Sequence, residues 1–290
     1  MMPRISVIVP VWNGATEIGR CLDALQAQDY PQELYEVIVV DNGSVDGTRA
    51  IVESYQGVTL LIEPAPGSYK ARNLGLAHAR GDYLAFTDAD CTPSKNWLRA
   101  GLLCALQNDN IGVVGGRIQL YDAGDSDPVC RVYENVFSFN QEMYLAKGHC
   151  ATANWISPAE LIRGMGGFDG NLLSGGDFEL SRRISAAGHA MVYSPDMVVS
   201  HPFRGGFIEL AAKRRRTTGG QWMVLRGALQ RARYVIAVVW SSLMDVSVLW
   251  RRTELPVGVK ARIIPIIVRL ATAQLREVLR LSLGGRPRRA

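Results

Sequence analysis

Two carboxylates, Asp88 and Asp90, follow directly on the apolar run 83–86. In an extended chain, residues i and i+2 point to the same side, so both carboxylates can face one ligand. Two like charges this close need a counter-charge, and Mg²⁺ is commonly bound by one or two carboxylates together with substrate phosphates. The pair therefore predicts a cation site at a strand end. The competing interpretation is a solvated acidic turn, because Asp favours turns.

Strands and helices are expected to alternate through the part of the chain that precedes this pair. Buried parallel strands are predicted from short β-rich runs at 5–10, 36–41, 58–62 and 83–87. Helices are predicted at 18–25, at 45–55 with Ser44 as the N-cap, and at 68–79. The pattern predicts an α/β fold with a doubly wound, mostly parallel sheet flanked by helices.

Ligands bind beyond the carboxyl ends of the strands in such a sheet. The predicted strand ends are polar at Asp41-Asn42-Gly43-Ser44 and at Thr87-Asp88-Ala89-Asp90. The chain has no G-x-G-x-x-G after the first strand and no G-x-x-x-x-G-K-[ST], which excludes the dinucleotide fingerprint and the P-loop. A metal ion is therefore the natural candidate for holding phosphates.

Charge is divided unevenly along the 290 residues. From His201 onward there are 18 Lys and Arg against 4 Asp and Glu, whereas residues 1–200 have 14 against 23. A basic tail on an acidic body indicates a negatively charged partner, such as a phosphate-rich membrane surface or a nucleic acid.

Two further features concern the compartment. The five cysteines form no C-x-x-C, so we interpret them as reduced thiols, mostly buried. No basic leader precedes a long apolar core at the N-terminus, because Pro10 ends the first apolar run, so a secretory signal is not expected. We expect a cytoplasmic protein.

Six motifs in order resemble the family 2 glycosyltransferases of the GT-A fold, which are inverting enzymes that use a nucleotide-sugar donor. The resemblance covers about residues 4–225, and the motifs are SVIVPVWN, VIVVDNGSVDGT, KARNLGL, YLAFTDADCTPSKNWL, GGFDGNLLSGGDFELSRR and VVSHPFRGG. It implies a catalytic domain at 1–225, with a nucleotide-binding half at about 1–115 and an acceptor half at about 116–225. Residues 226–290 would form a basic helical tail.

The resemblance assigns the donor site to five residues. Pro10 and Trp12 match the loop beside the nucleotide base, and Asp41 matches the carboxylate that accepts from the base. Arg72 matches the arginine that steadies the donor near its phosphates, a role suited to a planar charged fork. The resemblance implies that Asp88 lies nearer the ribose or makes a second contact to the metal. Without the resemblance, Asp41 could be the cap of a turn and Arg72 a solvated side chain.

The resemblance also implies a divalent cation, Mn²⁺ or Mg²⁺, with Asp90 as its ligand. His201 matches a histidine that completes the metal site in part of the family. A neutral imidazole suits Mn²⁺ better than Mg²⁺. A lone histidine is also often structural.

Asp177 matches the catalytic base that deprotonates the acceptor hydroxyl. The preceding Gly-rich segment predicts that Asp177 lies in the first turn of a helix, where the dipole favours an anion. The sequence departs from the family here, because Gly176 replaces the usual Glu. Glu179 could take part of that glutamate's role, and Asp169 is a rival base.

In the tail, the apolar stretch 234–250 is flanked by arginines but contains Asp245, which argues against a clean membrane span. Residues 260–283 have a basic and an apolar face, which favours a helix lying on an anionic membrane surface. The alternative is that these helices pack on the catalytic domain or on a second subunit. The Q-x-x-R-W of processive synthases is missing, since Gln221-Trp222 has the wrong spacing from the arginines before it.

Together these features predict a metal-dependent glycosyltransferase, peripheral on the inner face of the cell membrane. It would transfer one sugar, with UDP as the expected nucleotide, to an acceptor that could be lipid-linked, in glycan, polysaccharide or glycolipid assembly. No nucleic-acid partner is expected, and the tail could form a homo-oligomer. The alternatives are a sugar nucleotidyltransferase-like enzyme and a non-catalytic membrane adaptor that retains the fold.

Overall fold

The computed structural model describes residues 2–124 and 126–288, and the chain divides into two compact units. The first covers the chain up to Tyr121 together with Phe139–Asn171 and Gly176–Pro202. The second contains Asp122–Ser138, Leu172–Gly175 and the chain from Phe203 onward. The expected boundary lay near residue 225, whereas the second unit begins earlier because three of its helices and an earlier helix share one core.

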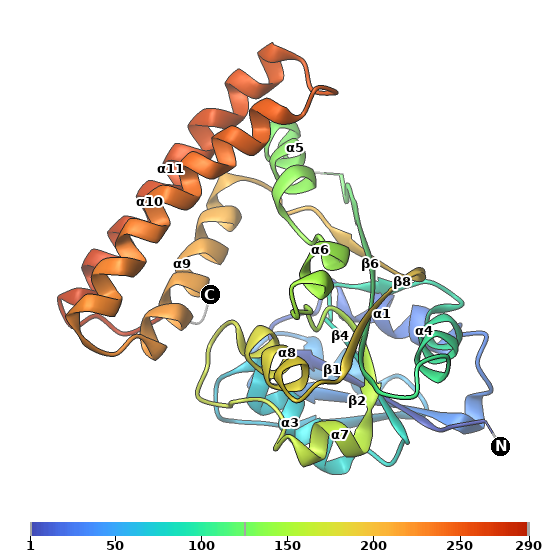
Figure 1. Ribbon diagram of the computed structural model, residues 1–290. Helices are drawn as coiled ribbons and strands as arrows, with labels where there is room; N and C mark the ends of the chain where they lie inside the picture. The colour runs from blue at the N-terminus through green and yellow to red at the C-terminus, as the bar shows by residue number, and fades with distance from the viewer. Residues whose placement is uncertain (1, 125, 289–290) are drawn as a thin grey trace. The chain divides into compact units, whose positions relative to one another are not determined.

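The first unit is a mixed α/β structure built on one curved sheet (Figure 1). Its described strands are β1 Ile5–Val11, β2 Tyr35–Asp41, β3 Val58–Ile62, β4 Tyr83–Thr87, β5 Thr92–Pro93, β6 Ile111–Tyr121, β7 Asn154–Pro158 and β8 Ala190–Pro202. Its described helices are α1 Ile18–Gln26, the 3₁₀ helix Gln32–Leu34, α2 Thr48–Glu53, α3 Ser68–His78, α4 Trp97–Leu106, α6 Gln141–Ala146, α7 Ala159–Gly164 and α8 Gly176–Ala186. The predicted α/β class and all four predicted N-terminal strands are confirmed.

Strand order in the sheet is β3-β2-β1-β4-β7-β6-β8-β5. The first four strands are mutually parallel, as is the pair β6 and β8, while β7 and β5 run antiparallel to their neighbours. The register places Val11 opposite Asp41 and Ile8 opposite Phe86. The carboxyl ends of β1, β2 and β4 therefore meet at one edge of the sheet, where the sequence has its polar motifs.

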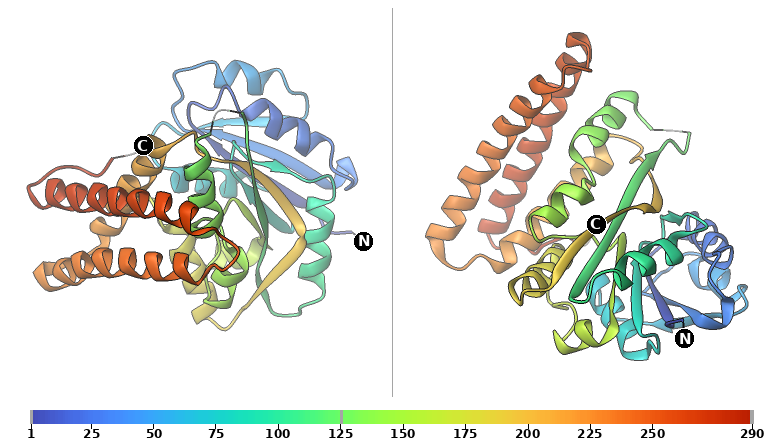
Figure 2. Two further views of the ribbon diagram at one scale, coloured as in Figure 1. Left: turned by 90° about the horizontal axis from the view of Figure 1, so that it is seen from above. Right: turned by 45° about the vertical axis from the view of Figure 1, so that its right-hand side comes forward.

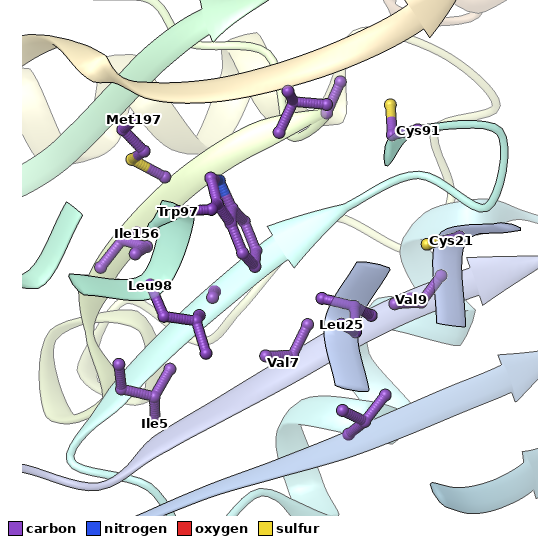
Figure 3. Close-up of a cluster of buried hydrophobic side chains, with 14 of the residues drawn as sticks. Ile5, Val7, Val9, Cys21, Leu25, Cys91, Trp97, Leu98, Ile156 and Met197 are labelled. Atoms are coloured by element: carbon purple, nitrogen blue, oxygen red, sulfur yellow. The ribbon is translucent and has the colours of Figure 1, made fainter. Parts of the chain in front are cut away.

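The hydrophobic core lies between the sheet and the helices α1 and α4 (Figure 3). Trp97 and Ile156 are fully buried in it. Asn154 is buried in the same region and accepts a hydrogen bond from Trp97 Nε1 at 2.9 Å. Its amide nitrogen donates to the carbonyls of Arg117 and Met197, both at 2.9 Å. The Asn154 side chain thus provides hydrogen-bond partners for polar groups on one helix and two strands: Trp97, Arg117 and Met197.

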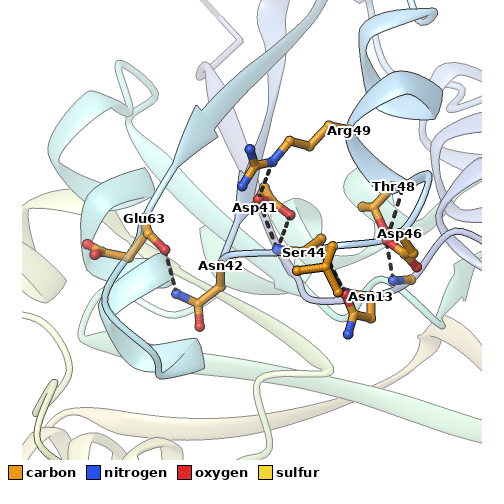
Figure 4. Close-up of polar contacts among 10 residues, drawn as sticks. Asn13, Asp41, Asn42, Ser44, Asp46, Thr48, Arg49 and Glu63 are labelled. Carbon is orange, nitrogen blue, oxygen red and sulfur yellow. Dashed lines mark hydrogen bonds and ion pairs between the residues drawn. The ribbon is translucent and has the colours of Figure 1, made fainter.

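One predicted helix begins later than expected. Residues 45–55 were predicted to be helical with Ser44 as the N-cap, but α2 begins at Thr48 with Gly47 before it. Ser44 Oγ accepts instead from the backbone N–H of Asn13 at 2.8 Å, and Asn13 Oδ1 accepts from the N–H of Val45 at 2.9 Å (Figure 4). These bonds between the loops after β1 and β2 hold residues 44 and 45 out of the helix.

The second unit is helical. Its described helices are α5 Pro128–Phe137, α9 Phe207–Val224, α10 Gly227–Arg251 and α11 Val257–Ser282. Helices α9, α10 and α11 run side by side (Figures 1 and 2). Their shared core is formed by side chains of all four helices: Cys130, Tyr133, Leu210, Ala211, Leu249, Ile263, Ile266, Ile267, Leu270 and Ala273.

The two long helices differ in what they expose. The apolar side of α11 is buried in this core, so the prediction that residues 260–283 present it to a membrane is wrong. Helix α10 instead exposes a row of apolar side chains: Leu229, Ile236, Val239, Trp240, Leu243, Met244, Val248 and Trp250. An apolar row of this extent is unusual on a soluble surface.

Among the described helices, α10 alone combines the length and the apolar composition needed to cross a membrane; its mean hydropathy is 1.4 and 11% of the apolar window is buried. Asp245 does not interrupt the exposed row. It lies on the same side of the helix as the buried Val238 and Leu249, and its carboxylate is 3.9 Å from the guanidinium of Arg214 on α9. The acidic side chain that argued against membrane contact therefore faces the interior of the helical unit.

We expect Asn154→Ala to lower the free energy of unfolding by roughly 2–4 kcal/mol, because it removes the partner of one buried N–H and of two buried carbonyls. Urea denaturation would measure the change. Asn108→Ala is the matched control, since the side chain of Asn108 donates to a carbonyl of the helix it follows. A loss below about 1 kcal/mol for Asn154→Ala would contradict the central role given to this side chain.

Candidate active site

The site is built first on the short segment that links β4 to β5. Asp88 and Asp90 follow β4, and the backbone N–H of Cys91 donates to the carbonyl of Asp88 at 3.0 Å, which makes the segment a tight turn. The two residues of β5 then pair antiparallel with β8, with Thr92 opposite Ser200. This register places Cys91 opposite His201, and so brings His201 beside a carboxylate 111 positions away in the sequence.

Asp90 and His201 face each other. The distance from Asp90 Oδ2 to His201 Nε2 is 3.3 Å, and Asp90 Oδ1 is buried without a hydrogen-bond partner among the described residues. His201 Nδ1 is 2.6 Å from the carbonyl oxygen of Pro202, to which it donates. That bond leaves Nε2 as the lone-pair nitrogen and orients the ring toward Asp90, which is the arrangement by which proteins prepare a histidine to bind a metal.

Cys91 is the third side chain of this group, since ligand atoms of Asp90, Cys91 and His201 lie within 4.8 Å of one another. Burial raises the pKa of the Cys91 thiol well above its usual range, and Asp90 raises it further. A neutral thiol is a poor ligand for Mg²⁺ or Mn²⁺, which prefer oxygen and imidazole. The residues that fit a cation are therefore Asp90 and His201.

Asp88 has a different partner. Its Oδ1 accepts from Arg72 Nη2 at 2.5 Å, and the Arg72 side chain is only 4% exposed. Burial raises the pKa of Asp88, and the Arg72 guanidinium opposes that rise. In the part of the chain that the structure describes, Arg72 Nε is buried and has no hydrogen-bond partner. A buried guanidinium with one arm occupied and one donor unused is suited to an additional anionic ligand.

Tyr69 connects this half of the site to Asp177. The Arg72 guanidinium lies 5.7 Å from the centre of the Tyr69 ring, and the Tyr69 hydroxyl donates to Asp177 Oδ1 at 3.0 Å. Burial raises the pKa of Tyr69, and the Asp177 carboxylate raises it further. The phenol therefore stays protonated and acts as a hydrogen-bond donor to that carboxylate. Asp177, in the first turn of α8 as predicted, is thereby fixed in orientation.

Gly176 makes room for that tyrosine. A Cβ atom at position 176 would lie 2.8 Å from two carbons of the Tyr69 ring, closer than side chains tolerate. Gly176, which departs from the family pattern, is therefore required by the position of the Tyr69 ring. With glycine at 176, Tyr69 occupies the space and supplies the polar contact to Asp177.

Two other predicted acidic residues are held by nearby groups. Glu179 pairs with Arg183, with Oε1 at 2.7 Å from Nε, and Arg183 also donates to the carbonyl of Gly167 at 2.7 Å. Asp169 accepts from the backbone N–H of Asn171 at 2.9 Å within its turn. Both contacts are structural, so the role expected for Glu179 remains a prediction.

Asp41 lies at the end of β2 and is fully buried. Its carboxylate accepts from the N–H of Ser44 at 3.2 Å and from Arg49 Nε at 2.8 Å (Figure 4). Pro10 is buried in β1, and Trp12, just beyond it, is 40% exposed. A base that bonds Asp41 would have to displace Arg49, whose side chain is 44% exposed and can move. The roles of these residues in base binding remain predictions.

The structure thus brings Arg72, Asp88, Asp90, Asp177 and His201 into one region of the first unit through the contacts above. Tyr69 and Arg49 are the residues that the sequence analysis missed. Tyr69 lies in the first turn of the helix that carries Arg72, three positions before it, and helical spacing places such residues on one face. That spacing could have indicated that Tyr69 lies near Arg72. The contact of Tyr69 with Asp177, however, depends on the space left by Gly176, more than a hundred residues away.

A family model described as "Glycosyl transferase family 2" matches residues 6–156. A curated relative, Glycosyltransferase AglE of Haloferax volcanii, is 36% identical over 240 residues, which cover 79% of this chain and 78% of that protein. Asp41, Arg72, Asp88 and Asp90 lie within the matched range, whereas Asp177 and His201 lie beyond it.

Two solved structures have a similar fold. The mannosyltransferase PcManGT from Pyrobaculum calidifontis, in complex with GDP-Man and Mn²⁺, is 22% identical, with 97% of this chain and 87% of that chain covered and a TM-score of 0.63. S. aureus TarS 1–349 in complex with UDP-GlcNAc is 17% identical, with 98% and 93% covered and a TM-score of 0.58. Both support the α/β fold with a helical extension.

We expect Gly176→Ala to lower the free energy of unfolding by roughly 1–3 kcal/mol, because the added methyl group overlaps the Tyr69 ring. Adding Tyr69→Ala should recover part of that loss, giving a coupling of about 1 kcal/mol in a double-mutant cycle. Gly164→Ala is the control, since a Cβ there meets open space. Purely additive losses would show that the two positions do not share space.

Proposed function

Since the chain belongs to glycosyl transferase family 2, we propose that it is a metal-dependent, inverting enzyme that moves one sugar from a nucleoside-diphosphate sugar to an acceptor hydroxyl. The observation that carries the proposal is the connected set of polar contacts in the first unit. A carboxylate and an imidazole prepared for a cation lie at one end, and a carboxylate held by Tyr69 lies at the other.

Asp177 is the base in this proposal. As the acceptor oxygen bonds to the anomeric carbon of the sugar, the bond from that carbon to the diphosphate oxygen breaks, and the hydroxyl proton passes to the Asp177 carboxylate. Attack opposite the leaving group inverts the carbon. Tyr69 keeps one oxygen of Asp177 occupied and fixes the carboxylate, so the other oxygen is directed to the acceptor.

Asp90 and His201 would hold a divalent cation, which supplies positive charge for the departing diphosphate. The imidazole ligand favours Mn²⁺ over Mg²⁺. Arg72 adds a fixed positive charge beside Asp88, and its unused Nε donor suits a phosphate oxygen. Trp12 and Asp41 would bind the base, with the carboxylate accepting from the imide N–H of uracil, which makes UDP the expected nucleotide.

Single transfer, rather than chain synthesis, is the proposed outcome. The Q-x-x-R-W motif of processive synthases is missing from the sequence, and Trp222 is instead buried between α9 and α11 within the helical unit. A tryptophan committed to a packing core does not line a channel for a growing polymer.

Attachment to the cytoplasmic face of the membrane is proposed through α10 rather than α11. Its exposed apolar row is flanked by Arg226, Arg231, Arg233, Arg251 and Arg252. Apolar contact combined with basic flanks favours an anionic lipid surface. An acceptor carried by a lipid would then be presented where the enzyme is bound, which suits glycolipid or polysaccharide assembly.

We expect UDP to bind the wild-type protein at least about tenfold more tightly with Mn²⁺ present, because a cation held by Asp90 and His201 would neutralise the diphosphate. Asp90→Ala should abolish the metal effect in isothermal titration calorimetry. Asp109→Ala, which removes an exposed carboxylate, should leave it unchanged. If the wild-type protein bound UDP equally with and without Mn²⁺, the proposed donor site would be wrong and the adaptor alternative would gain support.

Asp177→Asn should lower the rate of sugar transfer by roughly 10²–10⁴-fold, because an amide cannot accept the acceptor proton, while UDP affinity stays the same. Products formed from a panel of nucleotide sugars and lipid extracts can be quantified by mass spectrometry. Asp169→Asn is the matched control for the rival base. Retained transfer in Asp177→Asn, with loss in Asp169→Asn, would reverse the assignment.

A further inference from the structure

The helical unit contains a basic cavity of about 600 Å³ between α9 and α11. Its lining is dominated by arginines from two helices and the C-terminal segment: Arg215, Arg269, Arg276, Arg280 and Arg288, with Phe207, Thr272, Ala273 and Glu277. None of these residues lies in the six motifs that carry the resemblance to glycosyltransferases.

The arginines of α11 are arranged to face this space together. Arg269, Arg276 and Arg280 are spaced seven and four residues apart, which places them on one side of the helix. Arg215 approaches from α9 and Arg288 from the C-terminal segment. Like charges four residues apart on a helix destabilise it unless an anion neutralises them.

Glu277 neutralises only part of this charge. The carboxylate is 2% exposed; it accepts from Arg280 Nε at 3.0 Å and lies 3.7 Å from Arg288 Nε. Arg269 is stacked over the Phe207 ring, 3.8 Å from its centre. For Arg215 and Arg276, no carboxylate of the described residues lies within ion-pair distance. The cavity therefore has an excess of positive charge that the described chain does not balance.

We propose that this cavity binds the phosphate group of a membrane lipid. Planar guanidinium groups bind phosphate oxygens in pairs, and several of them around one cavity favour a dianion over a singly charged carboxylate. A lipid with an unsubstituted phosphate offers such a dianion, whereas a headgroup esterified to the phosphate offers one charge fewer.

Helix α10 favours a lipid over a free phosphate as the source. Val278 and Leu281, beside the cavity on α11, pack in one small core with Trp222 of α9 and with Tyr234 and Val235 of α10. The next residues of α10 include Ile236 and Trp240, which are 67% and 61% exposed. A headgroup in the cavity and acyl chains along α10 would thus be held by one packed unit. The inference shares with the proposed function only the membrane contact of α10, not the transfer reaction.

The test is flotation of the full chain with three kinds of phosphatidylcholine vesicle: plain, with phosphatidic acid, and with phosphatidylserine at twice the mole fraction of the acid. The wild-type protein should bind the phosphatidic acid vesicles about tenfold more tightly than the phosphatidylserine vesicles, because only the former offer an unsubstituted phosphate. Arg276→Gln and Arg215→Gln, on different helices, should each remove most of that preference. Arg262→Gln, an exposed arginine of α11 outside the cavity, should keep it.

Equal binding to both anionic vesicles would overturn the proposal, since α10 and net charge would then explain the attachment. Calorimetry with glycerol 3-phosphate tests the source: binding as tight as to the phosphatidic acid vesicles would overturn the assignment to a lipid, whereas weak binding lost in Arg276→Gln supports it. UDP titration of Arg276→Gln should match the wild type. If the wild-type protein failed to bind UDP, the proposed donor site would be wrong, but the result of the vesicle flotation would still decide the lipid proposal.

Discussion

The buried guanidinium of Arg72 is the constraint on which the candidate active site depends. A buried positive charge is costly unless it is paired, and here it is paired with Asp88 on one side and lies over the Tyr69 ring on the other. Because Tyr69 also bonds Asp177, Arg72 and Tyr69 together link the loop after β4 to the first turn of α8. Two motifs almost ninety residues apart are thereby held as one site.

The contact between Tyr69 and Asp177 also explains the glycine at position 176. Compared with the family pattern, this position has lost a glutamate. In the structure the glycine admits the Tyr69 ring, whose hydroxyl takes the place of an acidic neighbour beside Asp177. A neutral donor and an anionic neighbour affect a carboxylate in opposite ways, since the donor stabilises the charged form. At position 176 the glycine therefore exchanges an acidic neighbour of Asp177 for a neutral hydrogen-bond donor.

In the helical unit, packing decides which helix surfaces are buried and which are exposed. Its core is formed by α5, α9, α10 and α11, which turns the apolar side of α11 inward and leaves that of α10 exposed. Asp245 and Arg214 face each other inside the unit, so the exposed row of α10 is free of acidic side chains. Basic residues of α11 then remain at the edge of the packed helices, where they line the cavity with Arg215. Amphipathic sequence alone could not say which of two adjacent helices would keep its apolar side exposed.

The sequence by itself determined the strands and most helices of the first unit, because period-2 and period-3.6 patterns report the local backbone. It also determined that Asp41, Asp88 and Asp90 lie at one edge of the sheet, since parallel strands end together. The resemblance implied that His201 joins Asp90, and only the tertiary structure decided that Arg49 covers Asp41 and that Tyr69 holds Asp177. These contacts join residues whose closeness depends on strand register and on packing volume, and no local pattern carries that information.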